Sequence, residues 1–478
     1  MNFLYPDMLI LILAIGVLAV DLILPQDEES NAPFLMSWLG LASIAVILIT
    51  QTPPPGDYMV GFGTYTINGI STIMKLLFTL ACLFSILLSK SYFTAGGNLR
   101  GKMNRHSEFM ALMIFCTFGM YTVASAGDMI SLFVGIELST IPLYILSSFY
   151  KDDRSSTEAA IKYIVMGSVS TAIGLFGFSF IYGAVGYVGF EDITNFVVNN
   201  PRDPFIWIGF ILILSSLGFK LGLAPFHMWA PDVYQGAPTP VTTFLSVGSK
   251  SVAVTALMLL IYGPLSAIHQ ETNTLLIVLA CLSMVIGNLG AMRQKELRRF
   301  MAYSSIAQAG YILVGFLGKG EFAQSSIIFY LFVFMFTNVC TFFIFSIIGQ
   351  KRTESFSSLR GLSKEKPMLA ALLMMCMFSL AGIPPFAGFT GKFILFASAA
   401  KEGYYWMVLV GALNSTVSLY YYLLIIKEAY INKPDENQPP LHLNTLQKIN
   451  LSILGTGVVL IGLIPIFYNR VSELVNLS

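Results

Sequence analysis

Charged residues are scarce in this sequence. Only 11% of its 478 residues are Asp, Glu, Lys or Arg, and 55% are hydrophobic, whereas a soluble protein carries about 25% charged residues. The mean hydropathy is +0.73. These values exclude an ordinary soluble domain and indicate an all-α polytopic protein of the lipid bilayer. A net charge of +1 gives no basic surface for a nucleic acid.

The sequence also lacks the motifs of a redox or nucleotide-binding protein. Its five cysteines lie singly at positions 82, 116, 281, 340 and 376 and form no CxxC pair, so neither an iron–sulfur site nor a disulfide framework is indicated. There is no GxGxxG motif, and no polar gap is long enough for a soluble domain. We therefore expect this chain to bind no cofactor and no metal.

Long apolar stretches fill most of the chain, and about 20 apolar residues suffice for a helix to cross the hydrocarbon core. The N-terminus has no Lys or Arg in front of the first stretch, which predicts a retained span rather than a cleaved signal peptide. We predict fourteen spans, at residues 4–24, 33–50, 68–90, 107–125, 128–150, 157–187, 204–227, 238–263, 273–292, 300–318, 324–349, 367–400, 404–427 and 448–468.

The basic residues between the spans are distributed unevenly. The gaps on the side of the two termini carry four Lys or Arg, and the gaps on the other side carry eighteen. Cytoplasmic loops are enriched in Lys and Arg. The sequence therefore predicts that the eighteen lie in cytoplasmic gaps and that both termini lie on the outer side of the membrane.

Five lysines and one glutamate lie inside the predicted spans. A charge at this depth costs about 2.5–3.5 kcal/mol on insertion scales, so such residues are functional candidates by default. No arginine is among them, and lysine is the basic residue that exchanges its proton readily when buried. This pattern favours proton or cation transfer. The residues are Glu137, Lys75, Lys162, Lys220, Lys250 and Lys392; Lys75, near the outer end of its span, is left out of the site as a snorkelling or locally paired residue.

Proline interrupts two predicted spans beside such a lysine. Pro225 follows Lys220, and Pro384 and Pro385 precede Lys392. A proline inside a helix costs about 3 kcal/mol, and non-helical backbone at membrane depth is tolerated only inside protein or beside a wet cavity. Interrupted helices at matching places in two halves are typical of a transport site between inverted repeats.

The resulting division has four parts. An N-terminal three-helix segment (1–106) precedes the first five-helix repeat (107–263), and a second repeat of opposite orientation (273–427) precedes a C-terminal helix (428–478). The two repeats contain spans 4–8 and 9–13. Each repeat is predicted to contain one broken helix.

The charged residues suggest an ordered path. Glu137 has no basic neighbour within a turn, so we expect its partner on another helix, with Lys220 as the candidate and Lys162 within reach of either. His227 could relay a proton from Lys220 to Lys250, or it could be a satisfied interfacial histidine. Four polar residues of span 10 could hold water or join helices: Tyr303, Ser304, Ser305 and Gln308.

Four segments carry a family resemblance: FVGIELSTIPLY, LGFKLGLAPFHMWAPDVYQGAPTPVTTFLSVGSK, RRFMAYSSIAQAGY and LAGIPPFAGFTGKF. They resemble the antiporter-like membrane subunits of respiratory complex I over about residues 1–470. The lysine in span 12 and the short C-terminus are most similar to the chain N branch. The resemblance implies fourteen helices with an inverted five-helix repeat, and the family's ionisable positions fall on Glu137, Lys162, Lys220, Lys250 and Lys392.

One departure concerns Gln308, where many relatives carry a histidine. Glutamine cannot titrate, so the resemblance leaves it at most a role in orienting water. The implied function is proton translocation, as a non-redox subunit of the translocase NADH:quinone oxidoreductase. The implied location is the bacterial plasma membrane, with both termini on the periplasmic side. NADH, FMN, iron–sulfur clusters and quinone are then expected in partner subunits, and the partners are neighbouring antiporter-like and small membrane subunits.

Three alternatives stay open at this point. The chain could be a subunit of an Mrp-type cation/proton antiporter, or a membrane subunit of an ion-pumping hydrogenase or ferredoxin-linked complex. It could also be a non-transporting assembly scaffold whose buried charges are structural.

Overall fold

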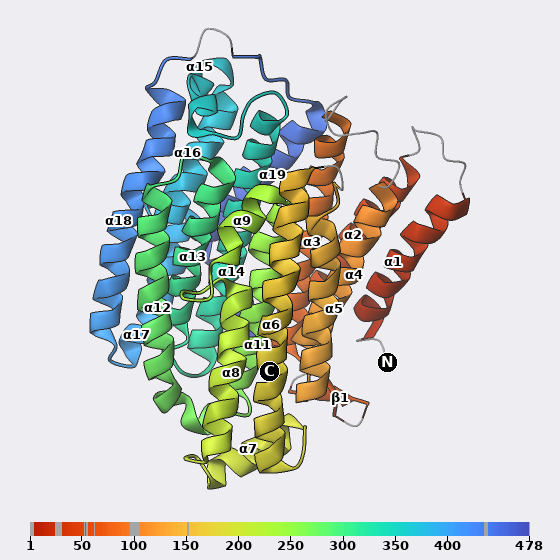
Figure 1. The fold of residues 1–478 in the computed structure, drawn as a ribbon, viewed down its shortest axis with the longest axis vertical. Coiled ribbons are helices and arrows are strands. Elements are labelled where there is room, and N and C mark those ends of the chain that lie inside the picture. Colours follow the sequence, from red (N-terminus) through yellow and green to blue (C-terminus); the bar gives the residue numbers. More distant parts are fainter. Residues whose placement is uncertain are drawn as a thin grey trace.

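The chain forms a bundle of long, roughly parallel helices (Figure 1). The computed structural model describes residues 4–23, 31–51, 53, 56–61, 63–95, 106–150, 153–434 and 438–477. Four of the loop cations behind the predicted orientation lie outside these residues: Arg100, Lys102, Arg105 and Lys151.

The N-terminal segment contains three helices and one hairpin. Helices α1 (Tyr5–Ile23) and α2 (Ala32–Thr50) stand at one edge of the bundle (Figure 1). Strands β1 (Tyr58–Val60) and β2 (Tyr65–Ile67) pair as an antiparallel hairpin in front of α3 (Gly69–Ala95). Both chain ends reach this hairpin, since Tyr65 donates to Asp7 and Gly56 N–H donates to the carbonyl of Leu477.

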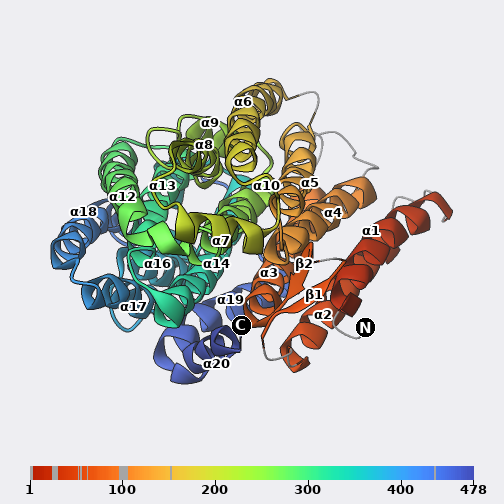
Figure 2. The same cartoon turned by 90° about the horizontal axis from the view of Figure 1, so that it is seen from below.

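The first five-helix unit begins with α4 (His106–Ala124), α5 (Met129–Ser147) and α6 (Arg154–Val185). Its fourth helix is broken into α8 (Pro204–Leu221) and α9 (Trp229–Gly236). Its fifth consists of α10 (Thr239–Phe244), a π-helical turn (Leu245–Ser249) and α11 (Lys250–Tyr262). The short helix α7 (Phe190–Asn199) crosses the lower end of the bundle, which faces the viewer in Figure 2.

The second unit repeats this order. It contains α12 (His269–Met292), α13 (Leu297–Gly315), α14 (Gly320–Gly349), the broken pair α16 (Pro367–Ala381) and α17 (Ala387–Lys401), and α18 (Tyr405–Tyr430). The one-turn helix α15 (Leu362–Glu365) caps the end opposite the hairpin, and α19 (Thr445–Leu463) and α20 (Pro465–Asn476) complete the chain (Figure 1). Every predicted span contains at least one of these helices, which confirms the predicted fold class.

Length and hydropathy mark twelve helices of the described part as able to cross a membrane. The two other predicted spans are α13, which is rich in polar residues, and the pair α16 and α17, whose halves have only 15 residues each. The finer residue limits of the four predicted parts stay a prediction.

Both broken helices end in the same way. Gly222 after α8 and Gly382 after α16 have φ of +69° and +83°, a conformation that glycine adopts without strain. At each break the glycine N–H and the next N–H bond back to carbonyls of the last turn, as in a Schellman motif. Both helices thus end inside the bundle. Backbone carbonyls of their last turns accept hydrogen bonds from buried side chains, Phe219 from Trp229 and Leu380 from Lys392.

Candidate functional site

Helices α5 and α8 bring Glu137 and Lys220 together. Lys220 Nζ lies 3.7 Å from Glu137 Oε1 and donates a hydrogen bond of 2.7 Å to Thr140 Oγ1. Thr171 on α6 donates to the same carboxylate oxygen at 2.9 Å. The lysine side chain is only 8% exposed. Its ammonium therefore relies on one carboxylate, one hydroxyl and the C-terminal end of α8, which favours a positive charge.

A small cavity of about 10 Å³ lies against this pair. That is about the space needed by one water molecule. Glu137, Thr171, Ser216 and Lys220 supply its polar lining, and apolar side chains supply the rest. Glycine at 174 lets α6 approach α8 closely beside the cavity, because a Cβ atom there would lie 2.7 Å from Ser216 Oγ. The site can hold a water beside the carboxylate and the ammonium.

Lys162 lies apart from this pair. Its Nζ forms ion pairs of 2.7 Å with Asp232 and 2.9 Å with Glu158, and its side chain is 41% exposed. In the described part of the chain, no ion pair joins Lys162 to Glu137. The expectation that it lies within reach of the pair is wrong for this structure.

Helix geometry explains the separation. Thr171 of α6 donates a hydrogen bond to Glu137, and Lys162 precedes it by nine residues, which is about 13.5 Å along the helix axis. Asp232, to which Lys162 binds instead, also accepts a bond of 2.6 Å from Arg299 on α13. Sequence reasoning missed Asp232 because the predicted span stopped at residue 227.

Lys250 is buried at the start of α11, with 1% exposure. Its Nζ donates to Ser305 Oγ at 2.9 Å and to the Ser305 carbonyl at 2.8 Å. It also lies beside the first helix break, because a Cβ atom at Gly222 would be 3.9 Å from Nζ. Across the described ranges, no carboxylate forms an ion pair with Lys250. The π-helical turn before it is a feature that often marks functional positions.

Lys392 is held by the broken end of α16. Its Nζ donates to the Leu380 carbonyl at 2.8 Å and to Ser415 Oγ at 3.0 Å, and it lies 4.2 Å from the centre of the Tyr311 ring. Free carbonyls at a helix C-terminus carry partial negative charge, and an aromatic face attracts a cation. This environment stabilises an ammonium without a carboxylate.

His227 lies in the link between α8 and α9. Its side chain is buried, and Nδ1 has no hydrogen-bond partner among the described residues. In the described part of the chain, no hydrogen bond joins His227 to Lys220 or Lys250. A relay through His227 therefore stays a prediction that would need an intervening water.

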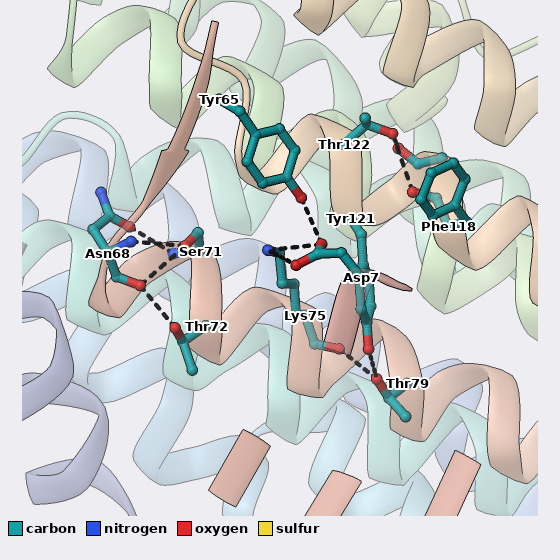
Figure 3. Close-up of polar contacts among 11 residues, drawn as sticks. Asp7, Tyr65, Asn68, Ser71, Thr72, Lys75, Thr79, Phe118, Tyr121 and Thr122 are labelled. Carbon is teal, nitrogen blue, oxygen red and sulfur yellow. Dashed lines mark hydrogen bonds and ion pairs between the residues drawn. The ribbon is translucent and has the colours of Figure 1, made fainter. Parts of the chain in front are cut away.

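Lys75 belongs to a separate buried cluster near the hairpin (Figure 3). Its Nζ lies 2.9 Å from Asp7 Oδ1 and 3.0 Å from Oδ2, and Tyr65 donates to Asp7 Oδ1 at 2.5 Å. The lysine is thus locally paired, one of the two expectations for it. Asp7 was missed, although a carboxylate inside the first predicted span was a signal for it.

An inverted pair of five-helix units, each broken beside a buried lysine, defines an antiporter-like membrane protein. The comparisons with known proteins give the family. Residues 126–418 match the family described as NADH:quinone oxidoreductase/Mrp antiporter, TM. The chain is 37% identical to NADH-quinone oxidoreductase subunit N of Moorella thermoacetica, covering 95% of this chain and 93% of that protein. It is 34% identical to subunit N of Desulforamulus reducens, covering 99% and 96%.

Solved structures agree with these relatives. A chain of respiratory complex I from Thermus thermophilus superposes with a TM-score of 0.79 at 30% identity, covering 96% of this chain and 97% of that one. A chain of the Mrp complex of a Dietzia species gives 0.85 at 20% identity, covering 98% and 97%, which shows the shared fold alone. This chain belongs to the NADH:quinone oxidoreductase/Mrp antiporter family and, within it, groups with the relatives named subunit N.

Proposed function

We propose that this chain is a proton-translocating membrane subunit of a bacterial NADH:quinone oxidoreductase. The observation that carries the proposal is the buried pair of Glu137 and Lys220 at the end of α8. The names of its relatives support the assignment to this complex. In this assignment, NADH, FMN, iron–sulfur clusters and quinone are bound by partner subunits, and this chain is a non-redox part of the enzyme.

The proposed cycle uses Glu137, Lys162, Lys220, Lys250 and Lys392. A carboxylate close to a lysine favours the charged lysine, and desolvation favours the neutral one. A charge change near Glu137 that weakens its interaction with Lys220 therefore releases a proton from Lys220. The proton passes to Lys250 and then to Lys392, with His227 as a candidate relay in the first step. Lys162 stands outside the central row and supplies charge from its pair with Asp232.

The proposed orientation places both termini outside. The hairpin end of the bundle holds both chain ends, and the opposite end holds α15 with basic residues on and around it. The enrichment of Lys and Arg at the α15 end supports its placement in the cytoplasm.

The test is Lys220→Met in the whole complex, assayed in inverted membrane vesicles. Proton pumping driven by NADH should be lost while the complex assembles with its flavin- and cluster-bearing partners. Lys448→Met is the matched control, because this lysine is exposed at the start of α19, and it should pump normally. Full pumping by assembled Lys220→Met would overturn the proposal, and a chain that purifies without redox partners would favour a separate antiporter.

A further inference from the structure

Between Lys250 and Lys392 lies a group of buried hydroxyls that the lysine row alone does not explain. Lys250 donates to Ser305 on α13. The preceding residue, Ser304, contacts Tyr422 on α18, and Gln308 one turn later contacts Tyr422 as well. Each of these residues is at most 1% exposed. Polar side chains of α13 thus contact Lys250 at Ser305 and Tyr422 at Ser304 and Gln308.

Gln308 is fixed at both ends of its side-chain amide. Its Nε2 donates to the Leu380 carbonyl at 3.0 Å and to the Tyr422 hydroxyl at 3.2 Å, and its Oε1 accepts from Tyr330 at 2.5 Å. The Leu380 carbonyl also accepts from Lys392. An amide has no proton to release at ordinary pH. Gln308 therefore orients its neighbours and does not carry a proton itself.

The contact between Ser304 and Tyr422 is different in kind. Their hydroxyl oxygens are 2.6 Å apart, and either one can be the donor. Because Gln308 donates to the tyrosine oxygen, Tyr422 can direct its own proton to Ser304, and it can also accept a proton from Ser304 on its second lone pair. A hydrogen bond with two allowed directions is what a proton relay requires.

We propose that Tyr422 and Ser304 form a hydroxyl relay that passes protons from Lys250 toward Lys392, with Gln308 as its positioning residue. The inference rests on the proposed function. One proton arrives at Ser304 Oγ from the Lys250 ammonium through water, while Ser305 Oγ accepts from Lys250 and donates its own proton to the Ala302 carbonyl. The Ser304 proton moves to the Tyr422 oxygen, and Tyr422 gives its proton through water to the neutral amine of Lys392. Both hydroxyls end neutral, and their rotation resets the pair.

The adjacent Tyr421 provides a matched control. It is as buried as Tyr422, with 1% against 0% exposure, and both rings make edge contacts with Phe300. Tyr421 donates to Asn288 Oδ1 at 2.8 Å, and that amide donates in turn to Asn414. The bond from Tyr421 to Asn288 therefore has one direction only, because an amide oxygen can only accept. Removal of either hydroxyl should perturb packing alike, but in the described part of the chain only Tyr422 bonds to Ser304 and Gln308.

The experiment compares Tyr422→Phe with Tyr421→Phe in the intact complex in inverted vesicles. Tyr422→Phe should lower the rate of NADH-driven proton pumping roughly tenfold, since a positioned proton-transfer group contributes about 10²–10⁴ in rate and water can restore part of the loss. The solvent deuterium isotope effect on pumping should rise as well. Ser304→Ala should behave like Tyr422→Phe, whereas Ser304→Thr, which retains a hydroxyl, should pump normally.

The outcomes separate this inference from the proposed function. Normal pumping and an unchanged isotope effect in assembled Tyr422→Phe would overturn the relay. The same is true of equal losses in Tyr421→Phe and Tyr422→Phe with no isotope effect, which would show a packing role. Lys220→Met run in parallel tests the proposed function itself, because its loss of pumping alongside normal Tyr422→Phe refutes only the relay.

Discussion

Lys162 and Asp232 form an ion pair of 2.7 Å that fastens α6 to the second half of the broken helix. Arg299 shares the same carboxylate from α13. One acidic side chain, directly after Pro231 in the sequence, thus ties together the two five-helix units. Its removal changes the charge balance of both units at once.

Asp232→Asn should therefore reduce pumping while the complex still assembles. The three side chains are about a third exposed, so each pair contributes at most about 1 kcal/mol to stability, and the melting temperature of the purified complex should fall only slightly. Glu158→Gln is the control, since Glu158 binds the same lysine but is 63% exposed. Pumping by Asp232→Asn at the control's level would show that Asp232 has no part in coupling.

Glu137→Gln should abolish pumping and also weaken the protein. It leaves the Lys220 ammonium with Thr140 as its direct side-chain partner, and a buried pair broken on one side costs about 3–5 kcal/mol. The double variant Glu137→Gln with Lys220→Met removes both charges. Thermal unfolding in detergent should show that the double variant recovers stability, while vesicle assays show that it does not pump. Recovery of pumping in the double variant would contradict a role for this pair.

Lys392→Arg separates charge from proton release. Arginine keeps a positive charge beside the α16 carbonyls but does not give up a proton in a protein. We expect assembly with little or no pumping, measured as the proton gradient formed per NADH oxidised. Lys401 lies at the exposed end of α17, the helix that carries Lys392, so Lys401→Arg should pump like the unchanged protein. A Lys392→Arg variant that pumps would rule out Lys392 as a proton carrier.

The cluster around Lys75 should prove structural. Lys75→Met strands the Asp7 carboxylate in the protein interior and should cost about 3–5 kcal/mol of unfolding free energy, whereas replacing both partners with apolar residues should cost little. The double variant Lys75→Met with Asp7→Leu is therefore expected to assemble and pump normally. A double variant that is stable yet fails to pump would bring this pair into the translocation path.

The sequence predicted the helices well because their positions depend mainly on local sequence. Apolar stretches of membrane-spanning length, with prolines at two fixed places, determine where helices form and break. Even α13, whose polar residues lower its hydropathy, was recognisable between its polar flanks. The contact of Glu137 with Lys220 could also be predicted, because few charged residues lie inside the spans and opposite charges attract each other.

The remaining contacts depend on positions that sequence does not encode locally. Lys162 appeared close to Glu137 because both lie in neighbouring spans, but its height along α6 decides which carboxylate it meets. Tyr422 looked like one aromatic among many in residues 404–427. What distinguishes its hydroxyl is the contact with Ser304 and Gln308, which lie more than a hundred residues earlier in the sequence.

Arg299, Ser305 and Gln308 all belong to α13 and contact Asp232, Lys250 and the Leu380 carbonyl. A helix rises 1.5 Å per residue and turns by about 100°, so these three contacts are spaced about 9 Å and 4.5 Å apart along one rigid rod. Loops elsewhere can lengthen or shorten without altering that spacing. A single residue inserted within the rod would turn part of it away from its partners, so α13 should be the segment least able to change length as the protein diverges.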